Sequence, residues 1–332
     1  MSGKNIGIIG AGSFGIALAY LLENNGHSVR VWTRSAENAK RFSEEKGNPS
    51  KLPGVTLKSA VFTSDMEEAL SDADEAVLVV PSIHVRKTAA LMKPYLKKGT
   101  IIVDCAKGIE ESTLNTLSEV ISAELNDIDP RIVVLSGPSH AEEVGKGLPT
   151  AIVAASDDAE AALTVQDDFM CPVFRVYTSD DRLGVELGGA VKNVIALAAG
   201  VADGLGYGDN TKAAMITRGM SEMARLGTAI GAKQATFFGL AGVGDLIVTC
   251  ASMHSRNRRA GILIGQGMNA ADACDKIGMV VEGVHCTRSA HMLSEKYGVT
   301  TPIIDEVYRV LFENKAPADA VADLMLRDKK AE

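Results

Sequence analysis

The sequence lacks any cluster of cysteines or histidines that would hold a metal or build a disulfide framework. Its five cysteines are widely spaced and include no Cys-x-x-Cys pair, and its six histidines are scattered without a His-Glu-x-x-His motif. The odd number of cysteines fits reduced thiols in a cytoplasmic protein better than a set of disulfides. We therefore expect no bound metal and a cytoplasmic location.

Long apolar runs, a secretory signal and an excess of positive charge are also absent. No uninterrupted apolar stretch reaches about 20 residues, the length of a membrane-spanning helix, and the N-terminus has no basic region followed by an apolar segment. The 34 basic and 42 acidic residues give a net charge of −8, which disfavours binding to nucleic acid or to an anionic membrane. We expect neither partner, although a local group of cations can still bind a small anionic substrate.

Two regions of the chain differ in their hydrophobic pattern. Residues 1–183 alternate short apolar runs with helical periodicity, which predicts a parallel sheet covered by helices on both faces. The strand-like runs are 4–9, 28–32, 76–80, 100–104, 131–135, 151–155 and 173–177. Residues 184–332 show mainly helical periodicity, over 185–202, 210–226, 260–266, 270–277, 287–296 and 301–312. The pattern predicts an N-terminal α/β domain, a polar break at residues 179–184 and an all-helical C-terminal domain.

A glycine-rich segment follows the first predicted strand. Gly10, Gly12 and Gly15 form the pattern Gly-x-Gly-x-x-Gly between that strand and a predicted helix, and this context gives the pattern its meaning. In a Rossmann fold the first glycine permits a tight turn, the second lets a pyrophosphate approach the backbone, and the third lets the helix pack on the strand. Free N–H groups and the positive end of the helix dipole then hold the phosphates. The segment predicts an NAD(P)-binding Rossmann domain, with a flexible loop as the alternative.

The end of the second predicted strand bears on cofactor choice. Sites for NAD place a carboxylate on the ribose 2′-hydroxyl about 20 residues past the glycines, but this sequence has Trp32-Thr33-Arg34-Ser35 there. Arg34 can pair with the 2′-phosphate of NADP or stack on the adenine. We expect NADP(H) to be favoured and NAD(H) to be usable, with a solvated surface arginine as the alternative.

Two further strand ends carry residues that suit ligand binding. Lys107 follows the strand at 100–104, and Gly137 and Ser139 follow the strand at 131–135. Because ligands of open parallel sheets bind beyond the carboxyl ends of the strands, we expect these residues to face the cofactor or the substrate.

Lys192 and Asp245 are candidates for proton transfer in the helical region. On a helical period Lys192 shares its face with four small residues, Gly188, Gly189, Ala196 and Ala199. A lysine on such a tightly packed face is expected to lose water, which suits it to acid–base chemistry; a side chain that reaches solvent is the alternative. Asp245 ends the segment 239–245, which we interpret as a tight connection between helices, and it can serve as a helix N-cap alone.

A group of polar and basic residues precedes the helix predicted from residue 260. Ser255, Arg256 and Asn257 combine a hydroxyl, a guanidinium and an amide near a helix N-terminus. Such a turn suits an oxyanion or a phosphate. With Arg258 and Arg259, which follow directly, it is a local group of cations in a negatively charged chain. A solvated basic turn is the alternative.

These motifs together resemble those of the soluble bacterial NAD(P)-dependent glycerol-3-phosphate dehydrogenases. The matching stretches span nearly the whole chain in the order of that family: GAGSFG at 10–15, CAKGIE at 105–110, LSGPSHAEEV at 135–144, ELGGAVKNVIALAAG at 186–200, GLAGVGDLIVTC at 239–250, SRNRRAG at 255–261 and VVEG at 280–283. The resemblance implies reduction of dihydroxyacetone phosphate to sn-glycerol 3-phosphate, which supplies glycerophospholipid synthesis. It also implies a helical substrate-binding domain and a cytoplasmic homodimer.

The resemblance further implies roles for individual residues. Lys192 would donate and accept the proton, Lys107 would contact both cofactor and substrate, and Asp245 would contact the hydroxyl end of the substrate. Other substrate contacts would come from Gly137, Ser139, Ser255, Arg256 and Asn257. Cofactor contacts would come from Gly10, Gly12, Ser13, Phe14, Gly15, Arg34, Lys107, Ala141, Arg256, Val280 and Glu282.

Two rival functions stay open at this point. A β-hydroxyacid or ketopantoate-type dehydrogenase would keep the fold and a lysine, but the turn at 255–257 suits a phosphate better than a lone carboxylate. A non-catalytic dinucleotide sensor would keep the Rossmann domain. It would be expected to have lost Lys107, Lys192 or Asp245, and all three are present.

Overall fold

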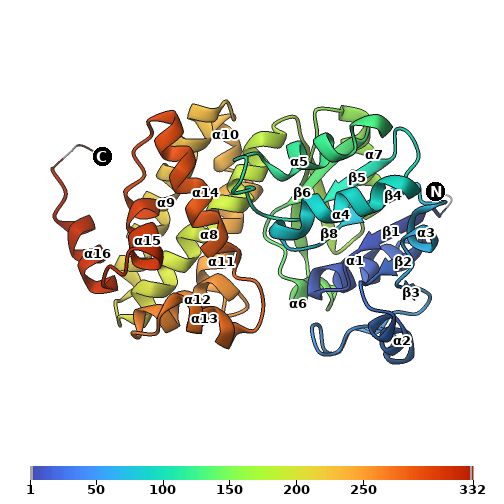
Figure 1. Cartoon of the computed structure of the whole chain (residues 1–332), viewed down its shortest axis with the longest axis horizontal. Helices are drawn as coiled ribbons and strands as arrows, with labels where there is room; N and C mark the ends of the chain where they lie inside the picture. The colour runs from blue at the N-terminus through green and yellow to red at the C-terminus, as the bar shows by residue number, and fades with distance from the viewer. Residues whose placement is uncertain (1–2, 330, 332) are drawn as a thin grey trace. The chain divides into compact units, whose positions relative to one another are not determined.

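The structure, a computed structural model, describes residues 3–329 and 331 and contains two compact units. Unit 1 comprises Met1–Lys107 and Thr116–Val185, and unit 2 comprises Gly108–Asn115 and Glu186–Glu332. Figure 1 labels their elements. The domain boundary expected after residue 183 stays a prediction, and the structure differs from it in one respect, because the short segment Gly108–Asn115 groups with unit 2.

Unit 1 is built on an eight-stranded sheet in the order β3-β2-β1-β4-β5-β6-β7-β8. Its strands are β1 (Asn5–Ile9), β2 (Ser28–Trp32), β3 (Val61–Thr63), β4 (Glu75–Leu78), β5 (Ile101–Asp104), β6 (Arg131–Ser136), β7 (Thr150–Ala155) and β8 (Phe174–Ser179). All neighbours are parallel except β6 and β7, which are antiparallel, so the expected parallel sheet is corrected to a mixed one. The connection from β6 to β7 holds only the four-residue helix α6 (Ala141–Val144). At 1.5 Å per residue this helix is about 6 Å long, so the connection lacks the longer helix that usually carries the chain back between parallel strands.

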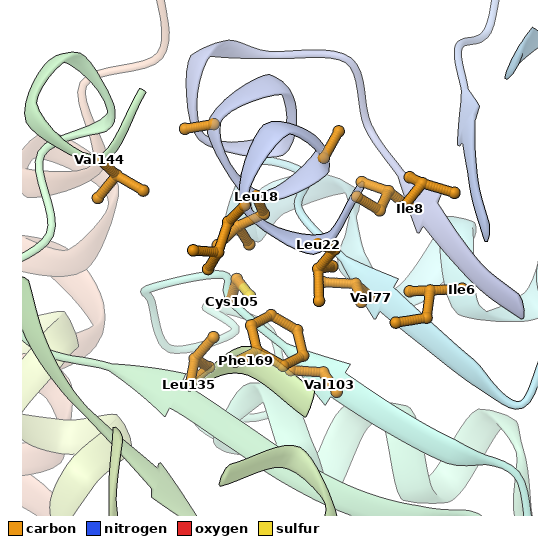
Figure 2. Close-up of a cluster of buried hydrophobic side chains, with 14 of the residues drawn as sticks. Ile6, Ile8, Leu18, Leu22, Val77, Val103, Cys105, Leu135, Val144 and Phe169 are labelled. Carbon is orange, nitrogen blue, oxygen red and sulfur yellow. The ribbon is translucent and has the colours of Figure 1, made fainter. Parts of the chain in front are cut away.

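Helices cover both faces of this sheet, as predicted. They are α1 (Ser13–Asn24), α2 (Ala36–Glu45), α3 (Met66–Leu70), α4 (Val85–Met92), α5 (Leu117–Glu124) and α7 (Ala159–Phe169), with short 3-10 turns at η1 (Ser82–His84), η2 (Lys93–Tyr95) and η3 (Asn126–Ile128). One buried core joins the sheet to α1, α2 and α7, and a second joins it to α3, α4 and α5. Val77 of β4 lies in the first core and its neighbours Ala76 and Leu78 lie in the second, which explains why the strands are apolar throughout. Figure 2 shows Leu18 of α1 and Phe169 of α7 within the first core.

The strand order places a ligand-binding edge at β1 and β4. The chain runs from β1 outward to β2 and β3, then returns to the other side of β1 with β4 and continues outward. In doubly wound sheets ligands bind beyond the carboxyl ends of the strands at this switch point. The prediction of a Rossmann-type domain is therefore confirmed.

Unit 2 is helical, and its described residues contain no strand. Its helices are α8 (Arg182–Gly204), α9 (Asp209–Ile230), α10 (Gln234–Phe237), α11 (Asp245–Ala251), α12 (Arg256–Gly265), α13 (Ala270–Ile277), α14 (Glu282–Tyr297), α15 (Pro302–Phe312) and α16 (Pro317–Met325), with a π-helical turn η4 (Leu240–Gly244). The all-helical prediction is confirmed, although the sequence pattern did not reveal α10 and α16. By length and composition alone, α8 and the stretch Gln234–Ala251 could cross a membrane, but the apolar window of α8 is wholly buried, as in a core helix.

The long helix α8 packs against α12 with almost no space between the two backbones. A Cβ atom added at Gly200 or at Gly261 would lie 2.1 Å from a carbonyl oxygen of the facing helix. One turn further along, Gly204 and Gly265 are constrained in the same way, with a distance of 2.3 Å at each. Four glycines therefore fix the position of α12 beside α8.

The segment Gly108–Asn115 is held within unit 2 by α14. The fully buried Ser289 donates a hydrogen bond to the carbonyl oxygen of Ile109 at 3.1 Å, and Arg288 pairs with Glu111 at 3.0 Å. Ile109 is itself buried. The residue before this segment is Lys107, so the chain passes into unit 2 directly after a predicted functional lysine.

Candidate active site

The glycine-rich loop joins β1 to α1 in the context that the sequence predicts. Gly10 has a φ of 126°, and a Cβ there would lie 2.3 Å from the carbonyl oxygen of Val79. A Cβ at Gly15 would lie 1.9 Å from the carbonyl oxygen of Gly10, so a larger residue would push α1 away from the loop. At Gly12 an added Cβ would meet no protein atom within 4 Å. Protein packing therefore does not explain Gly12, whereas a backbone surface that an external group approaches does.

The N-terminus of α1 presents amide groups without a capping side chain. Gly12 is the N-cap residue and offers no side-chain acceptor, so the first N–H groups of the helix have no partner within it. Around the loop, the Ser13 hydroxyl donates to the carbonyl oxygen of Lys51 at 2.8 Å, and the Asn48 amide donates to that of Ala11 at 2.7 Å. The loop is thus held open and fits a pyrophosphate, which the helix dipole would stabilise.

Arg34 lies just beyond the end of β2, next to this loop. The amide of Gly10 donates to the carbonyl oxygen of Trp32 at 3.1 Å, so the two strand ends are adjacent. Arg34 is exposed, and Ser35 after it caps α2 through its hydroxyl. Phe14, by contrast, is half-buried and packs against the first core. The exposed guanidinium is therefore positioned to meet an anion at this edge of the sheet.

Lys107, Gly137 and Ser139 lie together beyond the ends of β5 and β6. The buried carboxylate of Asp104, the last residue of β5, accepts a hydrogen bond from the amide of Ala106 at 3.0 Å and turns the chain. The Lys107 ammonium donates to the carbonyl oxygen of Gly137 at 3.3 Å, and the Ser139 hydroxyl donates to the same oxygen at 3.1 Å. The three residues thus form one polar group at the carboxyl edge of the sheet.

Lys192 is buried in α8 and paired with α11. Its side chain is 7% exposed, and Nζ lies 2.5 Å from Oδ1 of Asp245, whose side chain is 2% exposed. Nζ also donates to Oγ1 of Thr249 at 2.7 Å, while the Thr249 hydroxyl donates to the carbonyl oxygen of Asp245 at 2.6 Å. The expected burial of Lys192 is confirmed, and a side chain that reaches solvent is excluded.

The carboxylate beside Lys192 sets the chemistry of this position. Burial alone favours an uncharged amine, but a carboxylate at hydrogen-bond distance stabilises the ammonium. Two charges can be buried together here because they are paired and because Thr249 adds a hydrogen bond. The arrangement holds an ammonium group in surroundings of low polarity, where its charge acts strongly on nearby groups.

A glycine of α8 makes room for this ion pair. A Cβ at Gly188 would lie 2.6 Å from the carbonyl oxygen of Ala241, so η4 packs directly on α8 one turn before Lys192. Asp245 follows η4 as the first residue of α11, and Gly244 is the N-cap. The interpretation of Asp245 as a helix cap alone is therefore wrong, because its carboxylate binds Lys192.

The N-terminus of α12 forms the predicted turn of polar and basic residues. Ser255 is buried and caps the helix by accepting from the amide of Arg258 at 3.2 Å. The Arg258 guanidinium binds within unit 2, to Asp203 at 2.8 Å and to the carbonyl oxygen of Ala251 at 2.6 Å. Arg256 is half-buried and is the first residue of the helix, where its charge and the helix dipole both attract an anion.

Asn257 is buried, and both ends of its side-chain amide are hydrogen-bonded. Its Nδ2 donates to Oδ1 of Asn193 at 2.8 Å, and its Oδ1 accepts from the amide of Gly283 at 2.9 Å. Asn193 follows Lys192 in α8, and Gly283 follows Glu282, the first residue of α14. Asn257 therefore connects three helices of unit 2.

The other expected cofactor contacts occur in two places. Ala141 is the buried first residue of α6 in unit 1. Val280 is half-buried just before α14 in unit 2, and Glu282 is the half-buried first residue of that helix. Their contacts with a cofactor stay predictions.

Thiolate chemistry is excluded at Cys105 and Cys250, which follow Asp104 and Thr249 in sequence. Burial raises the pKa of Cys250 to about 12 and raises the pKa of Cys105 well above its usual range. Both are therefore protonated at neutral pH and unsuited to nucleophilic attack.

Thr249 and Asn193 are two polar residues beside these candidates that the sequence pattern did not single out, although the sequence carries a signal for each. Thr249 lies four residues after Asp245 in an otherwise apolar run, so the two share a helical face. Asn193 adjoins Lys192 in the middle of α8, and residues 187–191 and 194–202 around the two are all apolar or glycine. Polar side chains in such surroundings are rarely buried without partners.

Comparison with known proteins gives consistent matches along the chain. Residues 5–162 match the family model for the N-terminus of NAD-dependent glycerol-3-phosphate dehydrogenase, and residues 181–322 match that for its C-terminus. The chain is 56% identical over 330 residues to a glycerol-3-phosphate dehydrogenase (NAD(P)+) of Agathobacter rectalis, covering 99% of this chain and 98% of the relative. It is 53% identical over 328 residues to that of Fusobacterium nucleatum, covering 98% of each. The crystal structure of a glycerol-3-phosphate dehydrogenase from Coxiella burnetii is similar with a TM-score of 0.94 and 38% identity, covering 98% of this chain and 99% of that one.

Proposed function

Because this chain belongs to the family of NAD-dependent glycerol-3-phosphate dehydrogenases, we propose that it catalyses the reversible reduction of dihydroxyacetone phosphate to sn-glycerol 3-phosphate with NAD(P)H. The observation that carries this proposal is the buried Lys192, held 2.5 Å from Asp245. Reduction of a ketone needs a proton at the oxygen as hydride reaches the carbon, and a buried ammonium supplies it.

The proton comes from Lys192. When bound, NAD(P)H supplies the hydride that reaches the ketone carbon. As the carbonyl π bond breaks, negative charge develops on the oxygen, and Lys192 transfers a proton to it from Nζ. Asp245 stabilises the ammonium before transfer, and Thr249 orients Nζ. In the oxidation direction the neutral Lys192 takes the proton back. Lys107, which the resemblance implies contacts both cofactor and substrate, would add a second positive charge.

The substrate phosphate is anchored by the turn before α12. Arg256 can bind it through two parallel N–H bonds, and Ser255 and the N-terminus of the helix add to its attraction. Because the phosphate takes no part in the bond being made, its binding energy serves to orient the ketone. Gly137, Ser139 and the carboxylate of Asp245 would complete the substrate contacts.

The cofactor is held by the loop between β1 and α1, with Arg34 setting the preference for NADPH over NADH. The open backbone at Gly12 supports this assignment, and so does the exposed guanidinium beside the loop. Further contacts would come from Ser13, Ala141, Arg256, Val280 and Glu282.

We also propose that the enzyme works as a cytoplasmic homodimer that supplies glycerophospholipid synthesis. The five cysteines are all unpaired, which suits a reducing compartment. Of the apolar stretch Gln234–Ala251, only 39% is buried, which leaves apolar surface that a second copy could cover. Light scattering coupled to size exclusion would measure the mass in solution, and a monomer would remove the dimer from the proposal.

The test of the reaction is NADPH oxidation by the purified protein, followed by absorbance. Dihydroxyacetone phosphate, dihydroxyacetone and ketopantoate are compared under the same conditions. Turnover of the phosphorylated ketone alone would support both the reaction and the phosphate turn. Turnover of ketopantoate instead would favour the ketopantoate-type rival, and tight NADPH binding without any turnover would favour a dinucleotide sensor.

A further inference from the structure

Arg258 joins the first turn of α12 to two other helices of unit 2. Nε and Nη2 of its guanidinium each lie 2.8 Å from Oδ2 of Asp203 in α8, and Nη1 donates to the carbonyl oxygen of Ala251 in α11 at 2.6 Å. Its own amide donates to the hydroxyl oxygen of Ser255 at 3.2 Å. We call this set of hydrogen bonds the guanidinium link. The side chains of Arg258 and Asp203 are 13% and 14% exposed, so water competes little for their bonds.

The backbone of Arg258 is also fixed against α8. A Cβ at Gly200 would lie 2.1 Å from the carbonyl oxygen of Arg258, and Asp203 follows Gly200 by about one turn of α8. The backbone and the side chain of Arg258 thus meet α8 at consecutive turns. Because the planar guanidinium is already oriented by this placement, it loses little further freedom when it binds its acceptors.

The carbonyl oxygen of Ala251 needs this bond. Ala251 is the last residue of α11, and the last carbonyl oxygens of a helix have no partner within the helix. A cation there donates hydrogen bonds and also opposes the negative end of the helix dipole. Between α11 and α12 lies the turn of residues 252–255. Arg258 closes this turn, because its guanidinium binds the residue before the turn and its amide binds Ser255 at the end of the turn.

The guanidinium link ties the end of α11 to α8, whereas the ion pair of Lys192 ties the start. Asp245, the first residue of α11, binds Lys192, and Ala251 is connected through Arg258 to Asp203. Asp203 lies about three turns after Lys192, so the two share a face of α8. The spacing between Lys192 and the turn of residues 252–255 is therefore fixed by α8 and these two attachments.

We propose that Arg258 is a positioning residue, whose guanidinium holds the turn of residues 252–255 closed so that Ser255 and Arg256 meet the substrate phosphate at a fixed distance from Lys192. This rests on the proposed function. It adds a residue to which the family resemblance assigns no role. Asp203 takes part through the guanidinium alone, because its carboxylate would repel a phosphate.

The test compares Arg258→Met, Asp203→Ala and the double variant. For each, kcat/KM is measured for dihydroxyacetone phosphate and for dihydroxyacetone by NADPH oxidation. Calorimetry gives the Kd of inorganic phosphate for the NADPH-saturated protein, and unfolding in urea checks the fold. Lys212→Met is the matched control, because Lys212 of α9 binds the other oxygen of the Asp203 carboxylate at 2.8 Å and lies outside the turn.

We expect Arg258→Met to lower kcat/KM for dihydroxyacetone phosphate by about tenfold, the usual effect of a lost hydrogen bond to a charged group. Its kcat/KM for dihydroxyacetone should stay within about twofold, because the phosphate-free ketone does not use the turn and Asp245 still binds Lys192. Asp203→Ala should show the same pattern and bind inorganic phosphate more weakly. The double variant should be no worse than Arg258→Met, because both changes break the same link. Lys212→Met should leave all three quantities within about twofold.

Four results would overturn the proposal. An Arg258→Met protein that prefers the phosphorylated ketone as strongly as the wild type would give Arg258 no part in phosphate binding. Tighter binding of inorganic phosphate by Asp203→Ala would mean that the released guanidinium is itself a phosphate ligand. A double variant whose losses multiply would mean that the two side chains act independently. Equal losses for both ketones, or in Lys212→Met, would reflect general loosening of unit 2.

Failure of the proposed function would give a different result. A wild-type protein that binds NADPH but does not reduce dihydroxyacetone phosphate would refute that function. The affinities of the same variants for inorganic phosphate would still test the guanidinium link, because they need no turnover.

Discussion

Replacing Lys192 by methionine measures what the buried ion pair contributes to the stability of unit 2. The side chains of Lys192 and Asp245 are 7% and 2% exposed. Without the lysine, the Asp245 carboxylate stays buried and loses the ammonium that lies 2.5 Å from its Oδ1. Thr249 cannot replace it, because its hydroxyl lies 3.3 Å from Oδ1 and already donates to a backbone carbonyl at 2.6 Å.

The expected cost follows from leaving one charge buried. Removing one partner of a buried pair costs about 3–5 kcal/mol, whereas removing both charges together costs little. We therefore expect Lys192→Met to lose about 3–5 kcal/mol of unfolding free energy and Lys192→Met/Asp245→Leu to recover most of it. The control is Lys212→Met, whose lysine is 23% exposed and lies 2.8 Å from Asp203. A pair that solvent reaches should lose less than about 1 kcal/mol.

Urea unfolding at neutral pH, followed by circular dichroism, gives these free energies for each protein. Midpoints and slopes are compared without ligand, because bound cofactor would stabilise the folded state of each variant to a different extent. The reasoning is refuted if Lys192→Met unfolds like the wild type, or if the double variant is as unstable as the sum of its two single changes.

Four other outcomes are expected. Glu75 is fully buried beside Lys4 and Asp168, and burial raises its pKa from 4.5 to about 8. The folded state therefore holds the proton more tightly than the unfolded state, and the stability that this contributes is present below about pH 4.5 and is lost as the pH rises to about 8. Glu75→Gln should flatten the fall in urea stability between about pH 4.5 and about pH 8. An unchanged pH profile would contradict this. Arg34→Asp should shift the preference from NADPH toward NADH. Lys40→Asp, the same charge change on the exposed face of α2, should not. If the ratio of kcat/KM for NADPH to kcat/KM for NADH is the same in Arg34→Asp as in the wild type, Arg34 has no part in the choice of cofactor. Arg256→Ala should raise the KM for dihydroxyacetone phosphate by at least about tenfold and reduce the preference for phosphorylated ketones, and an unchanged KM would place the phosphate elsewhere. Gly261→Ala should lose about 1–3 kcal/mol of unfolding free energy, since its Cβ would lie 2.1 Å from a carbonyl oxygen of α8; a stability equal to the wild type would mean that the two helices separate at no cost.

Local features of the fold could be predicted because neighbouring residues determine them. The strand, the glycines and the helix from Asn5 to Asn24 are contiguous, and Gly10 and Gly15 have the steric reasons that their positions in the turn imply. The face of small residues around Lys192 likewise follows from helical spacing. It favoured a buried lysine, and Lys192 is buried. Periodicity also placed seven of the strands, but it missed the three-residue β3, which is too short to show a pattern.

Features that depend on distant parts of the chain could not be predicted in this way. Asp245 lies 53 residues from Lys192, and only the packing of η4 on Gly188 brings its carboxylate to the ammonium. The antiparallel pairing of β7 goes with a connection that holds only a four-residue helix, and the composition of the strand does not reveal it. The hydrogen bonds of Asn257 could not be predicted either, because its two partners lie 64 and 26 residues away.

The hold of α14 on the segment Gly108–Asn115 has a consequence for synthesis of the protein. Ser289 and its partner Ile109 are 180 residues apart. A ribosome adding about 5–20 residues per second needs roughly 9–36 s to cover that distance. During that interval Ile109, which ends up buried, has no α14 to cover it. A gene fragment that ends at residue 185 would encode every strand of the sheet and still leave this segment permanently uncovered. The two halves of the molecule therefore cannot be separated by a single cut in the coding sequence.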